Sequence, residues 1–193
     1  MDPDDAILPD LPHGPALGRA LRGWRALRRV KQAHLAEILG CSQPSVSRLE
    51  AGERAPSARE AATIRRLLAA RLDSAGDRAL GELVSRSPAP MHLICDATHR
   101  LLALSPARAA YLRAPASELM GRSTWPSATE ELAAAEARLG ELGWHEAAAP
   151  AVEGITRAGG SAEIEIPASR WRWVRMPLSD GRFARIVETL GPA

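Results

Sequence analysis

The 193-residue sequence contains two cysteines, one tyrosine, one phenylalanine and a single lysine, Lys31. Cys41 and Cys95 lie in segments that we assign to different domains, so the sequence predicts no structural disulfide and favours a reducing compartment. No stretch approaches the roughly 20 apolar residues that a transmembrane helix requires. The acidic start, Met1 to Asp5, lacks the basic residues of a signal peptide. We therefore expect a cytoplasmic protein that makes no membrane contact.

The sequence also lacks the short motifs of common catalytic sites. We find no HExxH, no CxxC, no phosphate-binding loop and no Gly-x-Ser-x-Gly. Haem would need an axial ligand, but none of His92, His99 and His145 occupies a convincing position, and we interpret them as packing or surface residues. We therefore expect no enzymatic activity, no metal site and no cofactor.

The net charge of +2 hides an uneven distribution of basic residues. Residues 1–15 contain four Asp and no Lys or Arg, so their charge is −4. Residues 16–72 contain twelve basic and four acidic residues (+8), and residues 73–193 contain thirteen basic and fifteen acidic residues (−2). A basic segment beside a nearly neutral remainder is typical of nucleic-acid-binding proteins. The alternative is a charged face that contacts only solvent.

Residues 30–56 predict two short helices joined by a tight turn. Leu35, Ala36 and Leu39 have the spacing of one apolar helix face. Gly40 ends this helix, because glycine adopts the left-handed conformation at low cost.

The second helix of the pair has one apolar and one polar face. Ser42 is a favoured N-cap residue, and Pro44 fits the first turn. Val46 and Leu49 form the inward pair, which leaves on the outer face Gln43, Ser45, Ser47 and Arg48. A short helix with these exposed side chains suits the major groove of DNA.

Two more helices flank this pair. The first extends from about Ala16 to Arg29, and its predicted inward residues are Leu17, Leu21, Trp24 and Leu27. The other begins after Ser57, which forms a predicted capping box with Glu60.

Several residues and short motifs follow one another along these helices: Leu21-Arg22-x-Trp24-Arg25, Gln32, Leu35-Ala36, Gly40, Val46-Ser47-Arg48-Leu49-Glu50, Gly52 and Pro56. In this order and spacing, the segment from about Leu17 to Leu68 resembles the helix-turn-helix of the XRE (Cro/cI-type) repressor family. Two positions depart from the family pattern, since Trp24 replaces a smaller aliphatic residue and Ala51 replaces a common Asn.

The resemblance implies a role for each matching residue. Gln32 would bind a phosphate through its amide and backbone N–H, and Gln43 would read a base edge. Arg48 would pair with guanine or hold a phosphate, whereas Arg25 and Glu50 would form a structural ion pair. The implied DNA-contacting set is Lys31, Gln32, Ser42, Gln43, Pro44, Ser45, Ser47, Arg48 and Arg54. For Gln43 and Arg48 the alternative is ordinary exposed surface.

The pattern changes in the second half of the chain. Residues 73–88 predict a connector helix with an apolar stripe of Leu80, Leu83 and Val84, which either pairs with its copy in a dimer or is a plain linker. Short apolar runs then predict a hairpin of residues 91–95 and 100–104. Further helices are expected at 106–113, 115–120 and 127–143, and strands at 162–166, 170–176 and 182–190, separated by turns at Gly159-Gly160 and Ser179-Asp180-Gly181.

A hairpin, several helices and three strands make an α+β layout that resembles a PAS domain. The resemblance is best in residues 91–123, through Ser105-Pro106-Ala107 and Ser117-Glu118-Leu119-Met120-Gly121-Arg122. It implies an internal pocket lined by Leu93, Leu102, Leu112, Leu119, Ile164, Ile166, Trp171 and Trp173. The alternative is that these side chains simply fill the core, and we expect the two Trp to pack against the helices and leave little space for a cofactor.

The predicted fold class is α + (α+β), an all-helical domain followed by an antiparallel-sheet domain. We predict a flexible acidic tail, a helix-turn-helix domain, the connector helix and a PAS-like dimerisation or sensor domain, at residues 1–15, 16–72, 73–88 and 89–190. The predicted function is sequence-specific transcription regulation on double-stranded DNA by a homodimer. One alternative is an activator whose PAS-like domain recruits RNA polymerase or another regulator. The other is a protein-interaction module without specific DNA binding.

Overall fold

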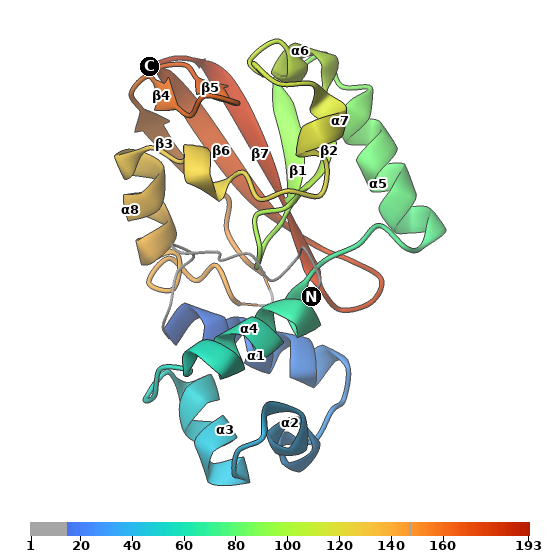
Figure 1. The fold of residues 1–193 in the computed structure, drawn as a ribbon, viewed down its shortest axis with the longest axis vertical. Coiled ribbons are helices and arrows are strands. Elements are labelled where there is room, and N and C mark those ends of the chain that lie inside the picture. The colour runs from blue at the N-terminus through green and yellow to red at the C-terminus, as the bar shows by residue number, and fades with distance from the viewer. Residues whose placement is uncertain (1–14, 147) are drawn as a thin grey trace.

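A computed structural model describes residues 15–146 and 148–193. The predicted acidic tail lies outside the described residues except for Pro15, which begins the first helix. The chain forms a helical N-terminal part and an α+β C-terminal part, which lie one above the other (Figure 1). Within the described residues, no helix combines the length and the apolar character needed to cross a membrane.

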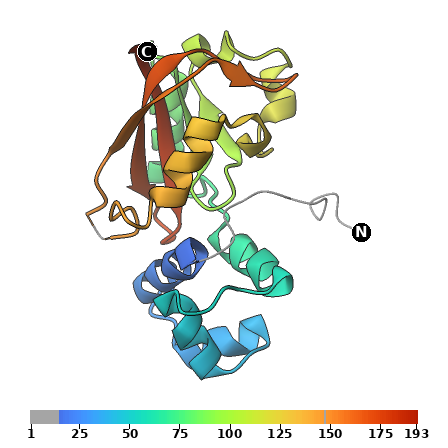
Figure 2. The same cartoon turned by 90° about the vertical axis from the view of Figure 1, so that its left-hand side faces the viewer.

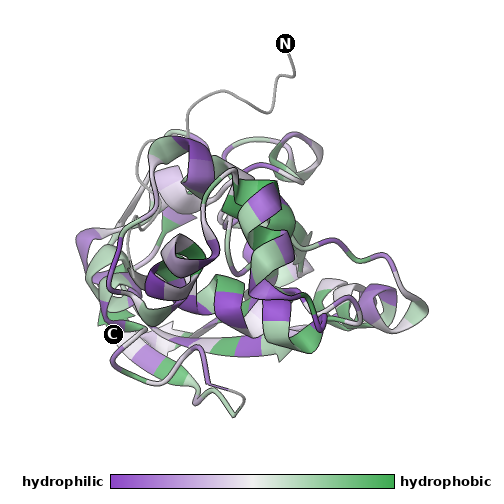
Figure 3. Ribbon diagram, turned by 90° about the horizontal axis from the view of Figure 1, so that it is seen from below, coloured by the Kyte–Doolittle hydropathy of each residue, from purple (hydrophilic) through white to green (hydrophobic). Residues whose placement is uncertain are grey.

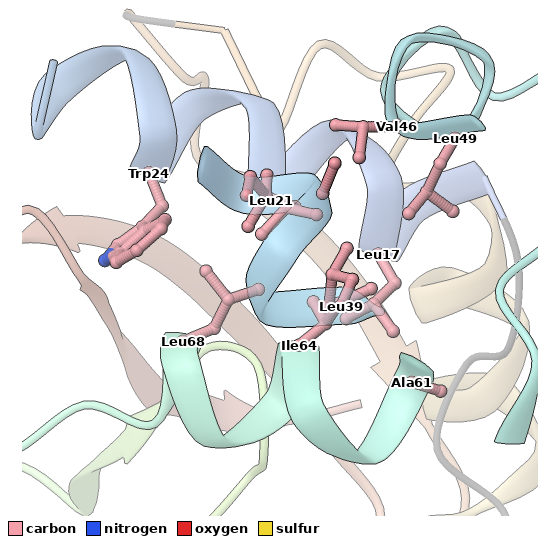
Figure 4. Packing of buried hydrophobic residues seen from close by; sticks show 11 residues of the cluster. Leu17, Leu21, Trp24, Leu39, Val46, Leu49, Ala61, Ile64 and Leu68 are labelled. Atoms are coloured by element: carbon pink, nitrogen blue, oxygen red, sulfur yellow. The ribbon is translucent and has the colours of Figure 1, made fainter. Parts of the chain in front are cut away.

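The N-terminal part consists of four helices packed around one core. These are α1 (Pro15–Leu27), α2 (Gln32–Leu39), α3 (Gln43–Ala51) and α4 (Ala58–Leu68). Figure 4 shows how side chains from all four helices meet, and the fully buried ones are Leu21, Leu35, Val46, Leu49 and Ile64. The predicted capping box of α4 is present, since Ser57 Oγ accepts from the backbone N–H of Glu60 and the Glu60 carboxylate accepts from that of Ser57.

The first helix ends two residues earlier than predicted. Arg29 has a φ of +53°, and the backbone N–H of Val30 donates to the carbonyl oxygen of Arg25. This left-handed turn ends α1 and directs the chain toward α2. As a result Leu27, which we expected to point inward, is 59% exposed, whereas Leu17, Leu21 and Trp24 are buried as predicted.

The C-terminal part is built on a five-stranded antiparallel sheet. Its strands are β1 (Met91–Cys95), β2 (Leu101–Leu104), β3 (Val152–Thr156), β6 (Ser169–Pro177) and β7 (Phe183–Pro192), in the order β2-β1-β7-β6-β3. Along the chain, the hairpin of β1 and β2 is followed by helices and then by the three other strands of this sheet. The predicted PAS-like layout and fold class are therefore confirmed.

The identity of one strand differs from the prediction. The outer strand beside β6 is β3, which we did not predict, and residues 162–166 do not join this sheet. Only β5 (Glu165–Ile166) is extended there, and it pairs with β4 (Gly159–Gly160), so the two glycines form a strand instead of the predicted turn. Gly154 weakens the strand pattern of β3, yet the structure requires it, because a Cβ there would lie 2.5 Å from the Trp171 ring.

Helices cover both faces of the sheet (Figure 2). One face carries α6 (Pro106–Ala109), α7 (Ala116–Leu119), the 3-10 helix η2 (Trp125–Ser127) and α8 (Glu130–Arg138). The helices α6, α7 and α8 are shorter than the three predicted segments, and η2 was not predicted. The other face carries α5 (Ala75–Ser85), the predicted connector helix, which packs on β1 and β2. Val84 is buried there and Leu80 is partly buried, whereas Leu83 is 72% exposed. Only two of the three residues of the predicted apolar stripe therefore pack against the sheet.

The two parts are in direct contact. Arg182 Nε donates to the carbonyl oxygen of Leu67 at 2.9 Å, and the backbone N–H of Ala70 donates to Cys95 Sγ at 3.2 Å. Ala97 packs against the hydrophobic clusters of both parts. The helical part is therefore joined to the sheet by packed side chains as well as by the chain itself.

Candidate nucleic-acid interface and internal cavity

The helix α3 lies at the end of the molecule that is far from the sheet (Figure 1). Gly40, with a φ of +66°, ends α2, and Ser42 Oγ accepts from the backbone N–H of Ser45 to begin α3. Val46 and Leu49 are fully buried, which turns the opposite face of α3 outward. Seen from this end, hydrophilic residues alternate with hydrophobic ones along the helices (Figure 3).

A chain of hydrogen bonds leads from the exposed start of α3 into the core. Gln43 Nε2 donates to Gln32 Oε1 at 2.7 Å, and Gln32 Nε2 donates to Glu50 Oε2 at 2.8 Å. Arg25 binds the same carboxylate twice, at 2.6 and 2.9 Å. Glu50 is only 3% exposed, so these bonds satisfy a buried charge. The ion pair of α1 with α3 thereby also fixes the orientation of Gln43.

The amide of Gln32 has a different role from the one we expected. Both of its polar atoms are bonded within the protein, one to Gln43 and one to Glu50. Its side chain is therefore a bridge that positions Gln43 and does not itself project toward a phosphate. A phosphate contact by Gln32 would therefore have to use the second N–H of Nε2 or the backbone N–H, which lies in the first turn of α2.

The guanidinium of Arg54 also forms hydrogen bonds within the protein. Its two terminal nitrogens donate to the Glu60 carboxylate at 2.9 and 2.8 Å, and one also reaches the carbonyl oxygen of Ala55. These bonds lower the pKa of Glu60 to about 2. The pair fixes the loop between α3 and α4, and a phosphate contact by Arg54 would have to use the terminal N–H that these bonds leave.

The other predicted DNA-contacting residues divide into two groups. Ser42 and Ser45 bond to each other across the first turn of α3, with 2.9 Å between their hydroxyl oxygens, and so act in capping. The side chains that are exposed at the surface of α3 and at the start of α2 are Lys31, Gln43, Pro44, Ser47 and Arg48. Within the described part of the chain, neither Lys31 nor Arg48 forms an ion pair. Both cations are thus available to a phosphate or a base.

A cavity of about 80 Å³ lies between the sheet and the helices α6 to α8. Five of the predicted pocket residues line it, namely Leu112, Ile164, Ile166, Trp171 and Trp173. Leu93 and Leu102 were assigned to the wrong face, because they pack in the cluster that faces α5. Leu119 packs beside the cavity against Ile94 and Leu101 without lining it.

Several polar groups at this cavity were missed in the sequence. His92 Nδ1, Trp171 Nε1 and His99 Nδ1 are buried and have no hydrogen-bond partner among the described residues, and His99 Nε2 lies 3.4 Å from Glu136 Oε1. Burial, together with the charge of Arg108, holds the pKa of His92 well below its usual value. The strand pattern contained a signal, since successive residues of a strand point to opposite faces and His92 therefore shares a face with Ile94, not with Leu93.

The tryptophan pair packs as expected against helix α8. The rings of Trp171 and Trp173 stack with 4.3 Å between their centroids, and Leu132 and Leu139 belong to the same cluster. The two indoles form one wall of the cavity and do not fill it. The remaining space is several times the roughly 10–15 Å³ that one water molecule needs.

No curated protein matches the sequence. Among solved structures, it is similar to the PAS domain of an HTR-like protein from Haloarcula marismortui, with 16% identity and a TM-score of 0.40 over 60% of this chain and 91% of that chain. It is also similar to an RNA-binding light-oxygen-voltage receptor, with 13% identity and a TM-score of 0.43 over 92% of this chain and 59% of that chain. Residues 16–75 match the family model of the helix-turn-helix domain, and the N-terminal part of the chain is therefore a helix-turn-helix domain.

Proposed function

We propose that the protein is a sequence-specific transcriptional regulator of the XRE type, which binds double-stranded DNA as a homodimer. The observation that carries this proposal is the presentation of Gln43 at the exposed start of α3, where Gln32 holds its amide nitrogen. One N–H and the carbonyl oxygen of the Gln43 amide stay available for a base edge. A held glutamine loses little conformational freedom on binding, which favours selective recognition of a base.

Arg48 supplies the charge on the same helix. It is exposed, one turn or more beyond Gln43, and forms no ion pair in the described residues. A free guanidinium can bind guanine O6 and N7 together, or a phosphate. Gln43 and Arg48 thus offer two contacts on the exposed side of α3, about 140° apart around the helix axis.

Dimerisation follows from the small size of this interface. One helix-turn-helix buries too little surface for tight and selective binding, and two copies on a two-fold axis can occupy half-sites about 34 Å apart. The α5 face of the sheet offers a surface for the second copy, because among the described residues β3 and the adjoining residues 170–172 of β6 and 188–190 of β7 lie outside the cluster that α5 covers. Ile155 is 58% exposed and Leu190 38% exposed in these strands, beside the ion pair of Arg172 with Glu188.

The DNA interface is tested by selecting a duplex from random sequences with the purified protein and measuring its affinity at fixed salt. Gln43→Ala and Arg48→Ala should each weaken binding to the selected duplex by about 1–3 kcal/mol and leave the fold intact. Arg170→Ala is the matched control, since Arg170 is exposed on β6 far from α3. Unchanged affinity in both α3 variants would show that this helix is not the reader. Binding without dependence on salt would favour the protein-interaction alternative.

A further inference from the structure

Arg108 is a buried cation for which the described residues provide no carboxylate. It belongs to α6, is 9% exposed and lines the cavity between the sheet and the helices α6 to α8. Within residues 15–146 and 148–193, its guanidinium forms no ion pair and no hydrogen bond, and the guanidinium carbon lies 5.5 Å from the centre of the Tyr111 ring. Burial lowers the pKa of Arg108, and the opposing effect comes from the Tyr111 phenol and not from a carboxylate.

The segment beside the end of α6 carries two acidic side chains, and both are paired with other arginines. Glu163 accepts from Arg122 at 3.0 Å, and Glu165 accepts from Arg113 at 3.1 Å. The two carboxylates are 44% and 50% exposed, and neither residue lines the cavity. Arg108 therefore remains a charged guanidinium at an apolar cavity. Such a charge is unfavourable unless a counter-ion balances it.

His92 lies close to Arg108 at the same cavity and supplies no negative charge. Burial, and then the charge of Arg108, hold the pKa of His92 well below its usual value, so its ring is neutral at pH 7. The ring is 7% exposed, and its Nδ1 has no hydrogen-bond partner among the described residues. A neutral imidazole carries one N–H that can donate to an anion. The environment of Arg108 therefore favours an anion from outside the chain.

Most of the remaining lining is apolar and limits the size of the anion. The apolar side chains include Leu104, Leu112, Ile164 and Ile166. The volume of about 80 Å³ is about half that of an apolar cavity of roughly 150 Å³, which holds benzene. The space therefore suits an alkyl group of one or two carbons attached to a charged group.

We propose that this cavity binds a short monocarboxylate of two or three carbons, whose carboxylate pairs with Arg108 and whose alkyl group contacts the apolar lining. The planar fork of a guanidinium matches the two oxygens of a carboxylate. One negative charge on the ligand balances the one unpaired cation. Because the ligand contacts α6 and the sheet together, its binding stabilises the α+β part.

The test uses the full-length protein without DNA, so its outcome is independent of the proposed regulatory function. Acetate, propionate, the neutral analogue propionamide and inorganic phosphate are titrated at constant ionic strength. Binding is followed by calorimetry, by tryptophan fluorescence, since Trp171 and Trp173 line the cavity, and by the midpoint of thermal unfolding. We expect saturable binding of acetate or propionate with a Kd of the order of 1 mM and a raised midpoint. Propionamide and phosphate should bind at least tenfold more weakly.

Two variants separate the charge from the space. Arg108→Met removes the cation but keeps a long unbranched side chain, so carboxylate binding should fall at least tenfold. Its midpoint without ligand should be no lower than that of the wild type, because a charge without a partner is removed. Leu112→Phe keeps Arg108 but fills part of the cavity, and should also weaken binding about tenfold. Arg113→Met is the matched control, since Arg113 is 56% exposed, pairs with Glu165 and does not line the cavity, and it should leave binding unchanged.

Several results would overturn the proposal. These are the absence of saturation up to about 50 mM, binding of propionamide or phosphate as tight as that of the carboxylates, and an unchanged carboxylate affinity of Arg108→Met. A midpoint of Arg108→Met below that of the wild type would show that Arg108 stabilises the fold without a ligand, and would also contradict the proposal. If Leu112→Phe fails to fold, Arg108→Met and its control still decide the question.

Discussion

Single residues of the helix-turn-helix act through their neighbours. Gln43 is the predicted base reader, but its orientation depends on Gln32, and Gln32 is held by the Glu50 carboxylate. Arg25 completes the chain from the other side. A change at Gln32 is therefore expected to affect base recognition through the orientation of Gln43.

We predict that Gln32→Ala weakens binding to the selected duplex, although the hydrogen bonds of the Gln32 side chain are to Gln43 and Glu50. The Gln43 amide then rotates freely, and ordering it on DNA costs up to about 1 kcal/mol. Anisotropy measurements on Gln32→Ala, Gln43→Ala and the double variant give the coupling between the two side chains. The effects should be less than additive, and full additivity would contradict the positioning role.

The Glu60 carboxylate gives the protein a defined sensitivity to acid. Its bonds from Arg54 lower its pKa from 4.5 to about 2, and the pKa returns to the higher value on unfolding. The stabilisation is therefore complete above about pH 4.5 and is lost as the pH falls from there toward 2. Glu60→Gln should be less stable at neutral pH and lose part of this slope.

Denaturant unfolding between pH 2 and 7 measures this difference. Glu53→Gln is the control, because Glu53 is exposed and forms no ion pair with the described residues. A parallel pH dependence of the wild type and Glu60→Gln would show that the Arg54–Glu60 pair does not respond to acid in this way.

At the scale of elements, local signals predicted the helices and missed one strand. The helix-turn-helix could be read from the sequence because each boundary has its own residue, such as Gly40 or Ser42, and each helix buries its own apolar face. The strand β3 has no such signal, because Gly154 interrupts its apolar pattern. A glycine is required there since any side chain would collide with the Trp171 ring of the neighbouring strand. Contacts between distant segments leave no local trace in the sequence.

The site residues show the same limit. The polar face of α3 follows from helical spacing alone, whereas the bonds that occupy Gln32 and Arg54 require knowledge of which helices meet. In the sheet, strand alternation separates Leu93 from His92 and Ile94, but it does not say which of the two faces α5 covers. It also does not reveal that Asp96 and Arg185, 89 residues apart, form a buried ion pair. Long-range ion pairs of this kind are not encoded in local periodicity.

The cavity between the sheet and α8 leads to a prediction about cofactors. It has a volume of about 80 Å³, and one wall is closed by the stacked indoles of Trp171 and Trp173. A flavin or haem requires a far larger space, roughly that of the 300–1,000 Å³ pockets that hold drug-sized ligands. The purified protein should be colourless, which an absorbance spectrum checks. A band beyond the range of protein aromatics, or a stoichiometric metabolite in native mass spectrometry, would show that the indoles line an occupied site.

At the scale of the whole molecule, the two surfaces of interest lie apart. The helix α3 is at the far end of the helical part, whereas β3 and the adjoining parts of β6 and β7, which are partly exposed on the α5 face, are in the α+β part (Figure 1). Pairing of two copies through the sheet therefore leaves both recognition helices accessible. Contacts such as Arg182 with Leu67 hold the helix-turn-helix domain against the sheet, so a dimer formed through the sheet would set the distance between the two α3 helices.

We predict that the full-length protein is a homodimer built through the α5 face of the sheet. Ile155→Glu places a charge on β3 at a side chain that is 58% exposed, and Leu83→Glu does the same on α5 at 72% exposure. Both changes should leave the monomer folded, because neither side chain is part of a core, but should weaken self-association by burying a charge without a partner.

Sedimentation or light scattering at tens of micromolar, about the range in which weak dimers form, measures this effect. Met120→Glu is the control, since Met120 is 40% exposed but follows α7, among the helices that cover the opposite face. We expect the wild type and Met120→Glu to be dimeric and the other two variants to shift toward monomer. The same two variants should lose affinity for a two-half-site duplex more than for a single half-site, because only the former needs both copies. A monomeric wild-type protein would contradict the predicted dimer. A dimer that neither Ile155→Glu nor Leu83→Glu weakens would show that the copies associate through another surface.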